Sequence, residues 1–209
     1  MHRIDEFDRI VFLGDYVDTW KNKWSAQISN LFNIVRFKKD NPEKVNLCWG
    51  NHDTSYYLNE QCSGYQPEHA VDLKDFFEKH KDYFEVVYEY DNWVFAHGGV
   101  SEKWMKCAGI EAVSEINQLF KERPNFFKWV GPDEFGDNEN EGPLWIRPRS
   151  LINHCIKKYN FCVGHTESNE PRIIHKNKQL FVFTDTQEHD TITIIDTKNN
   201  KVNFEKLIF

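Results

Sequence analysis

No stretch of this 209-residue chain approaches the roughly 18 consecutive apolar residues that a membrane-spanning helix needs, so we expect no membrane partner. An excess of positive charge is also missing, since 33 acidic residues outnumber 26 lysine and arginine residues. The formal net charge is −7, which gives no basic footprint for nucleic acid but allows a phosphorylated substrate where cations are bound. The five cysteines include no C-x-x-C pair, and the N-terminus has no apolar signal segment. These absences predict a soluble, cytoplasmic protein with reduced cysteines.

The composition is that of a folded protein. Apolar residues make up 40% of the sequence and aromatic residues 15%, which is enough for a packed core. No internal repeat, low-complexity tract or linker interrupts the chain. Because 209 residues suit one sizeable core, we expect a single domain over residues 1–209.

Four short polar blocks stand out, because each directly follows an apolar run that favours a β-strand. Each block joins glycine to residue types that bind metal ions. Since the carboxyl ends of neighbouring parallel strands gather at one edge of a sheet, we expect the blocks to converge on one ion site. The blocks are Gly14-Asp15-Tyr16-Val17-Asp18, Gly50-Asn51-His52-Asp53, Ala96-His97-Gly98-Gly99 and Gly164-His165-Thr166.

The hydrophobic pattern predicts an α/β fold. Strands at 9–13 and 44–49 flank a helix at 24–38, which favours parallel neighbouring strands joined by a helical crossover. The last forty residues favour an antiparallel tail, and the sheets are therefore expected to be mixed. The other predicted strands are 84–89, 92–96, 160–163, 172–175, 179–183, 191–196 and 201–208, with helices within 54–82, 101–130 and 149–158 and an acidic loop at 131–142.

A metal-binding hypothesis follows from the residue types in the blocks. Asp15 offers a carboxylate that can bridge two divalent cations, and Asn51 offers a neutral carbonyl oxygen. His97 and His165 offer imidazole nitrogens, and this mixture suits Mn²⁺, Fe²⁺ or Zn²⁺ better than Ca²⁺. Each block alone is explained as well by a turn, or by a histidine at the end of a strand with an ordinary structural role. Only the combination of the four blocks favours a metal site.

The same blocks offer an acid–base pair. His52 directly follows Asn51 and is placed to protonate a leaving group. Asp18, three residues after Asp15, is able to orient that imidazole and to stabilise its charge.

Together and in this order, the four blocks resemble those of the calcineurin-like metallophosphoesterase superfamily, in particular its phosphoprotein-phosphatase-like bacterial and phage branch. The resemblance covers essentially the whole chain from residue 8 on. It implies a four-layer α/β/β/α sandwich with mixed sheets, and hydrolysis of phosphate esters with two metal ions.

The resemblance also implies residue roles. Asp15 bridges the two metals, and His52 paired with Asp18 is the general acid. Water between the metals is deprotonated and attacks phosphorus in line. The ligands that complete one of the two metal sites are Asn51, His97 and His165.

Three departures from the family pattern matter, the first two for activity and the third only for the choice of subfamily. The family opens with an Asp-x-His block after an N-terminal strand, whereas only thirteen residues precede Gly14 here. We therefore expect the sandwich to lack that strand and the second metal to lack its own ligands. Thr19-Trp20 stands where phosphoprotein phosphatases have a phosphate-gripping Arg-Gly, and Asp53 stands where they usually have Glu.

An arginine further along the chain is a candidate to make the phosphate contact that the missing Arg-Gly would have made. Leu144-Trp145-Ile146-Arg147 resembles a Trp-x-Arg element of bacterial family members in which the arginine contacts phosphate. Guanidinium is suited to bidentate phosphate binding, so Arg147 is assigned to substrate binding. The alternative is a surface arginine beside Pro148 and Arg149.

The sequence thus predicts a metal-dependent phosphoesterase that acts on a phosphoprotein, a nucleotide or a small phosphoester by attack of a metal-activated water. One alternative is a degenerate, catalytically impaired family member that binds a metal or a phosphorylated ligand without turnover. Another is an unrelated α/β domain with chance motifs. The identity of the metal (Mn, Fe or Zn) stays open, as does the number of ions, two as in the family or one here.

Overall fold

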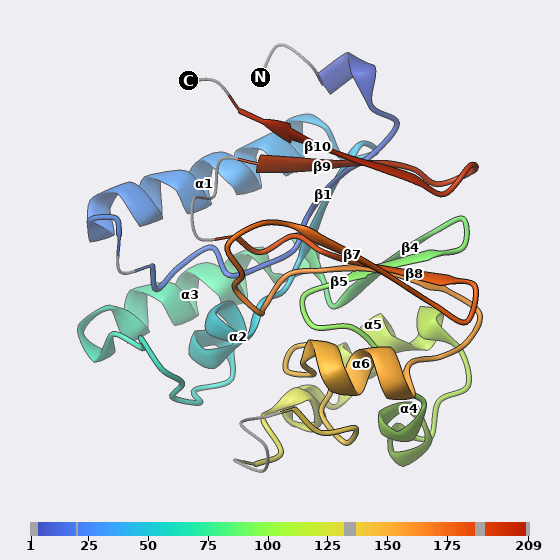
Figure 1. The fold of residues 1–209 in the computed structure, drawn as a ribbon. Coiled ribbons are helices and arrows are strands. Elements are labelled where there is room, and N and C mark those ends of the chain that lie inside the picture. The colour runs from blue at the N-terminus through green and yellow to red at the C-terminus, as the bar shows by residue number, and fades with distance from the viewer. Residues whose placement is uncertain (1–3, 20, 132–136, 187–190, 208–209) are drawn as a thin grey trace. The chain divides into compact units, whose positions relative to one another are not determined.

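Two compact units make up the chain, Met1–Val86 and Val87–Phe209 (Figure 1). The computed structural model describes residues 4–19, 21–131, 137–186 and 191–207. The single domain over residues 1–209 stays a prediction.

The first unit contains a parallel sheet with strand order β1-β2-β3. Its middle strand has the apolar sequence Val45–Cys48 and is buried along its whole length, as a strand covered on both faces must be. The parallel β1–β2 pair puts the ends of both strands at one edge of the sheet. The elements in order are η1 (Ile4–Glu6), β1 (Ile10–Phe12), α1 (Trp24–Asp40), β2 (Val45–Cys48), α2 (Asn51–Tyr57), η2 (Pro67–His69), α3 (Ala70–His80), η3 (Lys81–Tyr83) and β3 (Phe84–Glu85).

Helical spacing of apolar residues explains how the first unit packs. Leu31 and Val35 are one turn apart on α1 and are buried, as is the equally spaced pair Leu73 and Phe77 on α3. Trp49, directly after β2, is buried and its ring centroid lies 4.6 Å from that of Phe84 and 5.3 Å from that of Phe77. This aromatic cluster fixes the chain at the point where it leaves β2 and enters α2.

The second unit contains a mixed sheet with strand order β4-β5-β6-β8-β7. The inner strands β5, β6 and β8 run parallel, and the outer strands β4 and β7 are antiparallel to their neighbours. The mixed sheet expected from the sequence is confirmed. The elements are β4 (Val87–Tyr90), β5 (Trp93–Ala96), α4 (Glu102–Ala108), η4 (Val113–Glu115), α5 (Ile116–Glu122), η5 (Pro124–Phe127), α6 (Pro148–His154), β6 (Asn160–Val163), β7 (Arg172–Lys176), β8 (Gln179–Phe183), β9 (Thr191–Asp196) and β10 (Lys201–Lys206).

A two-stranded antiparallel hairpin, β9–β10, closes the chain. The turn between its strands is tied to the mixed sheet through Asn200, whose Oδ1 accepts hydrogen bonds from Trp93 Nε1 (3.0 Å) and Asn160 Nδ2 (2.8 Å). Both donors begin inner strands of the sheet. The hairpin therefore anchors the end of β5 and β6 opposite to the one that carries the polar blocks.

Two local predictions differ from the structure. Helix α2 begins at Asn51 rather than near residue 54, because Gly50 acts as N-cap and the Asp53 side chain accepts the Gly50 backbone N–H in a capping box. The predicted strand 84–89 is divided at Val86 into β3 and β4, which belong to different sheets. Part of the predicted acidic loop, residues 132–136, lies outside the described residues.

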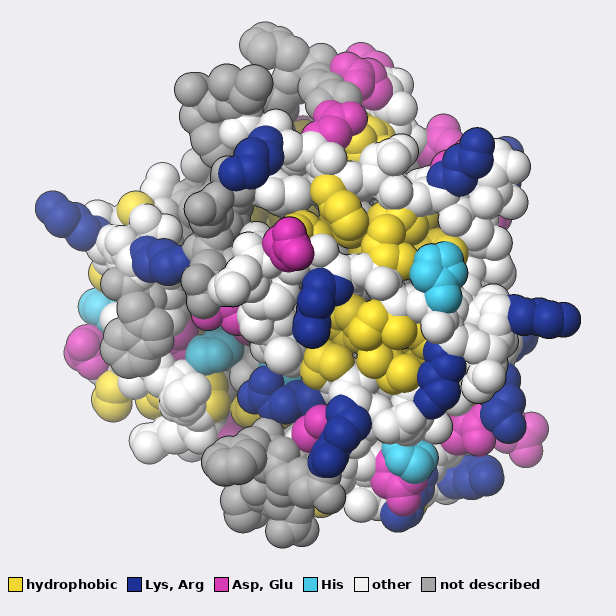
Figure 2. Space-filling view, in the orientation of Figure 1, with side chains coloured by type: hydrophobic (Ala, Val, Ile, Leu, Met, Phe, Trp, Pro, Cys, Tyr) yellow, Lys and Arg dark blue, Asp and Glu magenta, His cyan; other side chains and the backbone are white. Residues whose placement is uncertain are grey.

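The surface mixes charged and apolar side chains. Lysine and arginine side chains are interspersed with acidic, histidine and apolar ones on the face seen in Figure 2. In the described part of the chain, the exposed large apolar side chains include Phe32, Val71 and the neighbours Trp129 and Val130. Among the described residues, none of the helices has the length and apolar character needed to cross a membrane.

Candidate functional site

The loop after β1 depends on a glycine in contact with the loop after β2. Gly14 has a φ of +93°, and a Cβ at this position would lie 2.4 Å from the backbone nitrogen of Gly50. No side chain fits that gap, so the two loops come together only because position 14 is glycine. Asp15 follows with a left-handed φ of 57° and an exposed side chain.

A buried carboxylate holds both loops together. Asp53 is fully buried, and its Oδ2 accepts the backbone N–H groups of Asp15 and Gly50, both at 2.9 Å. Its Oδ1 accepts the N–H of Tyr16, also at 2.9 Å. Sequence reasoning assigned no role to Asp53. The signal that identifies it is its place three residues after Gly50, the N3 position of a capping box.

The two predicted metal ligands of the first unit lie at the same edge of its sheet. Asp15 follows β1, and its Oδ1 accepts the backbone N–H of His52 at 3.1 Å. Asn51 is the first residue of α2 after β2, and it is buried. A Cβ on Gly50 would lie 2.1 Å from Asp15 Oδ1, so this glycine also leaves room for the Asp15 carboxylate. Asp15 and Asn51 therefore both follow strands that end at one edge of the first-unit sheet.

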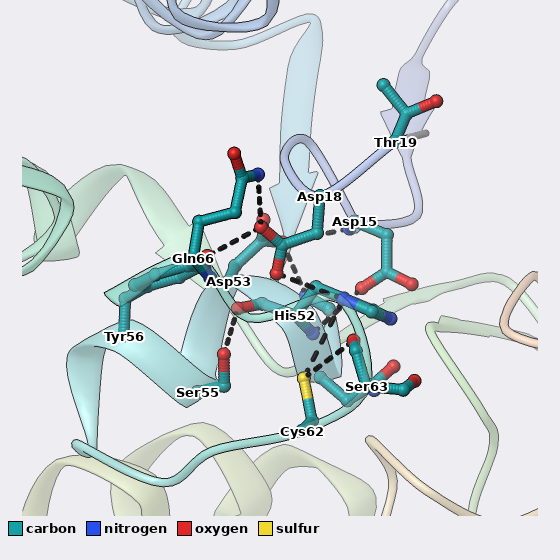
Figure 3. A network of polar contacts seen from close by, with 12 residues as sticks. Asp15, Asp18, Thr19, His52, Asp53, Ser55, Tyr56, Cys62, Ser63 and Gln66 are labelled. Carbon is teal, nitrogen blue, oxygen red and sulfur yellow. Dashed lines mark hydrogen bonds and ion pairs between the residues drawn. The ribbon is translucent and has the colours of Figure 1, made fainter. Parts of the chain in front are cut away.

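His52 and Asp18, which the sequence predicts to be an acid–base pair, lie within hydrogen-bond distance of each other (Figure 3). His52 Nδ1 lies 3.2 Å from Asp18 Oδ2; the His52 side chain is 22% exposed and the Asp18 side chain fully buried. The other carboxylate oxygen of Asp18 accepts bonds from Tyr56 Oη (2.5 Å) and Gln66 Nε2 (3.2 Å). With Nδ1 turned to Asp18, the nitrogen left to exchange a proton with another molecule is His52 Nε2.

The surroundings of His52 favour its charged form. Burial lowers the pKa of His52, but the hydrogen bond to Asp18, the contact with Cys62 Sγ and the charge of Asp15 outweigh it and raise the pKa to about 11. These contacts favour the protonated imidazole, in which both ring nitrogens carry a proton. Burial, and then the bond to Asp18, raise the pKa of Tyr56 far above its usual value, so Tyr56 stays a neutral donor to that carboxylate.

His97 and His165 meet in the second unit. His97 directly follows β5, His165 follows β6, and the parallel pairing of these strands brings the two rings together. His165 Nδ1 lies 3.2 Å from His97 Nε2, and His165 Nε2 lies 3.1 Å from the backbone oxygen of Trp145. A carbonyl oxygen only accepts, so His165 Nε2 carries the proton and Nδ1 presents a lone pair toward His97. His165 adopts a left-handed φ of 64°, which turns its ring in this direction.

This histidine pair fits a single cation. Nitrogen ligands bound to one metal at about 2.0–2.1 Å lie about 3 to 3.5 Å apart, and the two ring nitrogens are 3.2 Å apart. A backbone carbonyl that fixes the far nitrogen of a ligating histidine is the usual outer support of such sites. His97 and His165 are therefore suited to hold one divalent metal.

Arg147 lies beside the same loops. Its Nη1 donates to Thr166 Oγ1 at 3.4 Å, next to His165. Pro143 O accepts the N–H of Gly98 at 2.7 Å, and a Cβ on Gly98 would lie 2.8 Å from the oxygen of Ile146. The segment 143–147 thus packs against the loop after β5 and reaches the loop after β6. The second unit brings together the predicted ligands His97 and His165 and the predicted phosphate contact Arg147.

The sequence of the chain matches a known family over most of its length. A profile of the calcineurin-like phosphoesterases matches residues 1–166, which includes all four polar blocks. This chain belongs to the calcineurin-like phosphoesterase family. The family resemblance predicted from the blocks is confirmed, and the parallel and mixed sheets are consistent with the metallophosphoesterase sandwich. Phosphoester hydrolysis in general and dependence on metal come with the family.

Solved structures share the fold of this calcineurin-like phosphoesterase. An isoleucine-to-methionine variant of a cold-active protein tyrosine phosphatase matches with a TM-score of 0.58 at 15% identity, over 95% of this chain and 69% of that chain. The cold-active protein-tyrosine phosphatase of a psychrophile, Shewanella sp., matches with a TM-score of 0.55 at 17% identity, over 84% and 59%. A further cold-active protein tyrosine phosphatase structure gives 0.54 at 15% identity, over 84% and 58%. At these identities the likeness concerns the fold alone.

The chain spans between 58% and 69% of the length of these three phosphatase chains. Comparison with curated proteins by sequence yields no match. For this calcineurin-like phosphoesterase, convergence of the first-unit ligands (Asp15 and Asn51) and the second-unit ligands (His97 and His165) on one ion site stays a prediction.

Proposed function

We propose that this calcineurin-like phosphoesterase is a metal-dependent phosphatase in which His52 is the general acid. The observation that carries the proposal is the His52–Asp18 pair: Nδ1 faces a fully buried carboxylate at 3.2 Å, and Nε2 remains to donate. A histidine oriented by a buried carboxylate is the arrangement that general acid–base catalysis requires.

The proposed ligands are Asp15 and Asn51 from the first unit and His97 and His165 from the second. Their oxygen and imidazole donors suit Mn²⁺, Fe²⁺ or Zn²⁺. When bound, such cations stabilise charge on phosphoryl oxygens and make water a better nucleophile at neutral pH. Support comes from the 3.2 Å spacing of the histidine nitrogens and from the Trp145 carbonyl that fixes the His165 tautomer.

The chain's own side chains have separate tasks in this proposal. Arg147 binds phosphoryl oxygens of the substrate through its guanidinium. His52 Nε2–H gives its proton to the departing oxygen as the bond to phosphorus breaks. A protonated imidazole is a stronger acid than an alcohol, so transfer to a departing alkoxide is downhill even with a pKa near 11. Asp18 positions the ring and stabilises its positive charge.

The proposed substrate is a phosphorylated molecule: a phosphoprotein, a nucleotide or a small phosphoester. A cytoplasmic location is part of the proposal and accords with the five cysteines, all of which are free in the structure. The competing proposal is a degenerate family member that binds metal or phosphorylated ligand without turnover.

Turnover of p-nitrophenyl phosphate with Mn²⁺ tests the proposal, together with the thermal shift that Mn²⁺ causes. We expect turnover in the parent protein and loss of both turnover and Mn²⁺ stabilisation in His97→Ala and His165→Ala. At a metal concentration of 100 times Kd, that stabilisation amounts to about 2.7 kcal/mol.

His175 is exposed and provides the matched control. We expect His175→Ala to keep both turnover and stabilisation by Mn²⁺. Mn²⁺ stabilisation without turnover supports the degenerate alternative. If none of Mn²⁺, Fe²⁺ and Zn²⁺ stabilises the protein, both the metal-dependent phosphatase and the degenerate metal-binding protein are contradicted. The predicted ligands then bind no metal.

A further inference from the structure

A cysteine lies against the acid–base pair and has no task in the proposed reaction. Cys62 is in the segment between α2 and η2, and its Sγ is 3.7 Å from His52 Nδ1 (Figure 3). The same nitrogen is 3.2 Å from Asp18 Oδ2, and one ligand atom of each of the three residues lies within 4.8 Å of the others. A thiol, an imidazole and a carboxylate thus face a common point.

The spacing of these atoms fits a tetrahedral cation. With Zn–N near 2.0–2.1 Å and Zn–S near 2.3 Å, a tetrahedral site has N···O separations of about 3.4 Å and N···S separations of about 3.6 Å. The observed separations are 3.2 Å and 3.7 Å. Two of the three separations thus match a tetrahedral site, and the third, between the Asp18 carboxylate and Cys62 Sγ, is no more than 4.8 Å.

Outer contacts hold the carboxylate in the orientation that such a site requires. Asp18 Oδ1 is engaged by Tyr56 Oη and Gln66 Nε2, which leaves Oδ2 on the side of His52 and Cys62. Cys62 and His52 are partly exposed, so an ion can reach them from solvent, and water can complete the coordination.

We propose that Asp18, His52 and Cys62 form an inhibitory site for Zn²⁺ that is distinct from the family's metal site. The thiol gives the site its selectivity, because sulfur ligands favour Zn²⁺ over Mn²⁺ and Mg²⁺. The residues proposed for the catalytic metal, Asp15, Asn51, His97 and His165, contribute no sulfur. On binding, the protons of Cys62 Sγ and His52 Nδ1 pass to solvent, and the ion takes their place.

The inhibitory consequence rests on the proposed function. Once Nδ1 is bound to Zn²⁺, His52 is a neutral metal ligand rather than a protonated imidazole oriented by Asp18, so the ring is no longer held to deliver the Nε2 proton to the leaving oxygen. Protonation of the leaving oxygen then fails. Substrates with a poor leaving group, such as alkyl phosphates, are therefore inhibited more strongly than p-nitrophenyl phosphate, whose leaving group needs little protonation.

Cobalt binding tests the site without any measurement of activity. Co²⁺ replaces Zn²⁺ in such sites and gives a near-ultraviolet charge-transfer band when a thiolate is bound. We expect this band in the reduced parent protein, its loss in Cys62→Ser, and its displacement by Zn²⁺. Cys107→Ser is the matched control, since Cys107 is an exposed cysteine of the second unit, and it keeps the band. A band that survives in Cys62→Ser, or its absence from the parent protein, overturns the proposal.

Zinc inhibition of the Mn²⁺-loaded enzyme tests the consequence. Each variant is compared with its own zinc-free rate. We expect Cys62→Ser to need at least about tenfold more Zn²⁺ for half-inhibition, with no change in Cys107→Ser. Equal zinc sensitivity in the parent and Cys62→Ser means that Zn²⁺ acts at the catalytic metals, and overturns the inhibitory role. If the protein has no turnover, the proposed function fails while the cobalt result still decides the site.

Discussion

The carboxylate of Asp53 holds the backbone of Asp15 in place: Asp53 Oδ2 accepts the Asp15 N–H at 2.9 Å. The same oxygen accepts the N–H of Gly50, at the N-cap of α2. A predicted bridging ligand is therefore positioned by the first turn of a helix that also carries Asn51 and His52. The Asp53 side chain therefore connects the first and second polar blocks through hydrogen bonds to the backbone of both.

We expect Asp53→Asn to destabilise the protein and to misplace Asp15. The amide replaces one accepting oxygen by an NH₂ group that faces backbone N–H donors, and the remaining acceptor is uncharged. Loss of buried, charge-assisted hydrogen bonds costs about 2–4 kcal/mol. Urea unfolding measures the loss, with the exposed Asp40→Asn as control. Equal stability of Asp53→Asn and the parent protein contradicts this account.

Replacement of His52 by alanine separates chemistry from binding. Because a general acid contributes about 10²–10⁴-fold, we expect His52→Ala to lower kcat on an alkyl phosphate by that factor. The loss on p-nitrophenyl phosphate is smaller, since its leaving group departs without full protonation. KM changes little in either case. An equal loss on both substrates, or a loss confined to KM, contradicts the acid role of His52.

Glycine at position 14 is a requirement of packing as well as of conformation. We expect Gly14→Ala to lower stability by several kcal/mol, since its Cβ would lie 2.4 Å from Gly50 N at a φ of +93°. Gly131→Ala is the control, because no atom of the described residues lies within 4 Å of a Cβ there. Thermal unfolding distinguishes the two variants, and similar midpoints contradict the close approach of the two loops.

Glu85 gives a pH dependence unrelated to the site. Burial raises the pKa of Glu85 to about 7, an effect that the charge of Lys38 partly offsets. A raised pKa means that the folded state binds the proton more tightly than the unfolded chain. This contribution to stability is full below the unfolded value of 4.5 and is lost as the pH rises through about 7.

Glu85→Gln removes this titration. We expect the variant to be more stable than the parent protein by roughly 1–3 kcal/mol at pH 8, and to match it near pH 4.5. Urea unfolding at the two pH values measures the difference, with the exposed Glu43→Gln as control. A stability difference that is the same at both pH values contradicts the burial of a titrating carboxyl group.

Much of the fold is readable from local patterns. The crossover from β1 through α1 to β2 follows from apolar residues at helical spacing, and the parallel β1–β2 pair agrees with it. The break at Val86 is not readable, because 84–89 is a continuous β-favouring run. Its division depends on pairing with two different strands, β2 on one side and β5 on the other.

Some residues of the candidate site can likewise be predicted from sequence, and others cannot. His97 and His165 are found from sequence because each directly follows an apolar strand, and parallel pairing brings them to 3.2 Å. Cys62 cannot be found from sequence in this way, because its loop has no periodic pattern that relates it to His52, ten residues earlier. Contacts made by irregular loops depend on tertiary packing rather than on a local repeat.

Several residues with proposed chemical tasks occupy backbone conformations that favour glycine: φ is 57° at Asp15, 68° at Asp18 and 64° at His165. Side chains at such angles cost up to about 1–2 kcal/mol each relative to glycine. Residues without a proposed chemical task, among them Asn59, Asp91 and Asn200, adopt the same conformation. Glycine at Asp15, Asp18 or His165 would therefore remove one functional side chain while leaving the loop backbone unstrained, so each position can be emptied of its chemistry without rebuilding the loop.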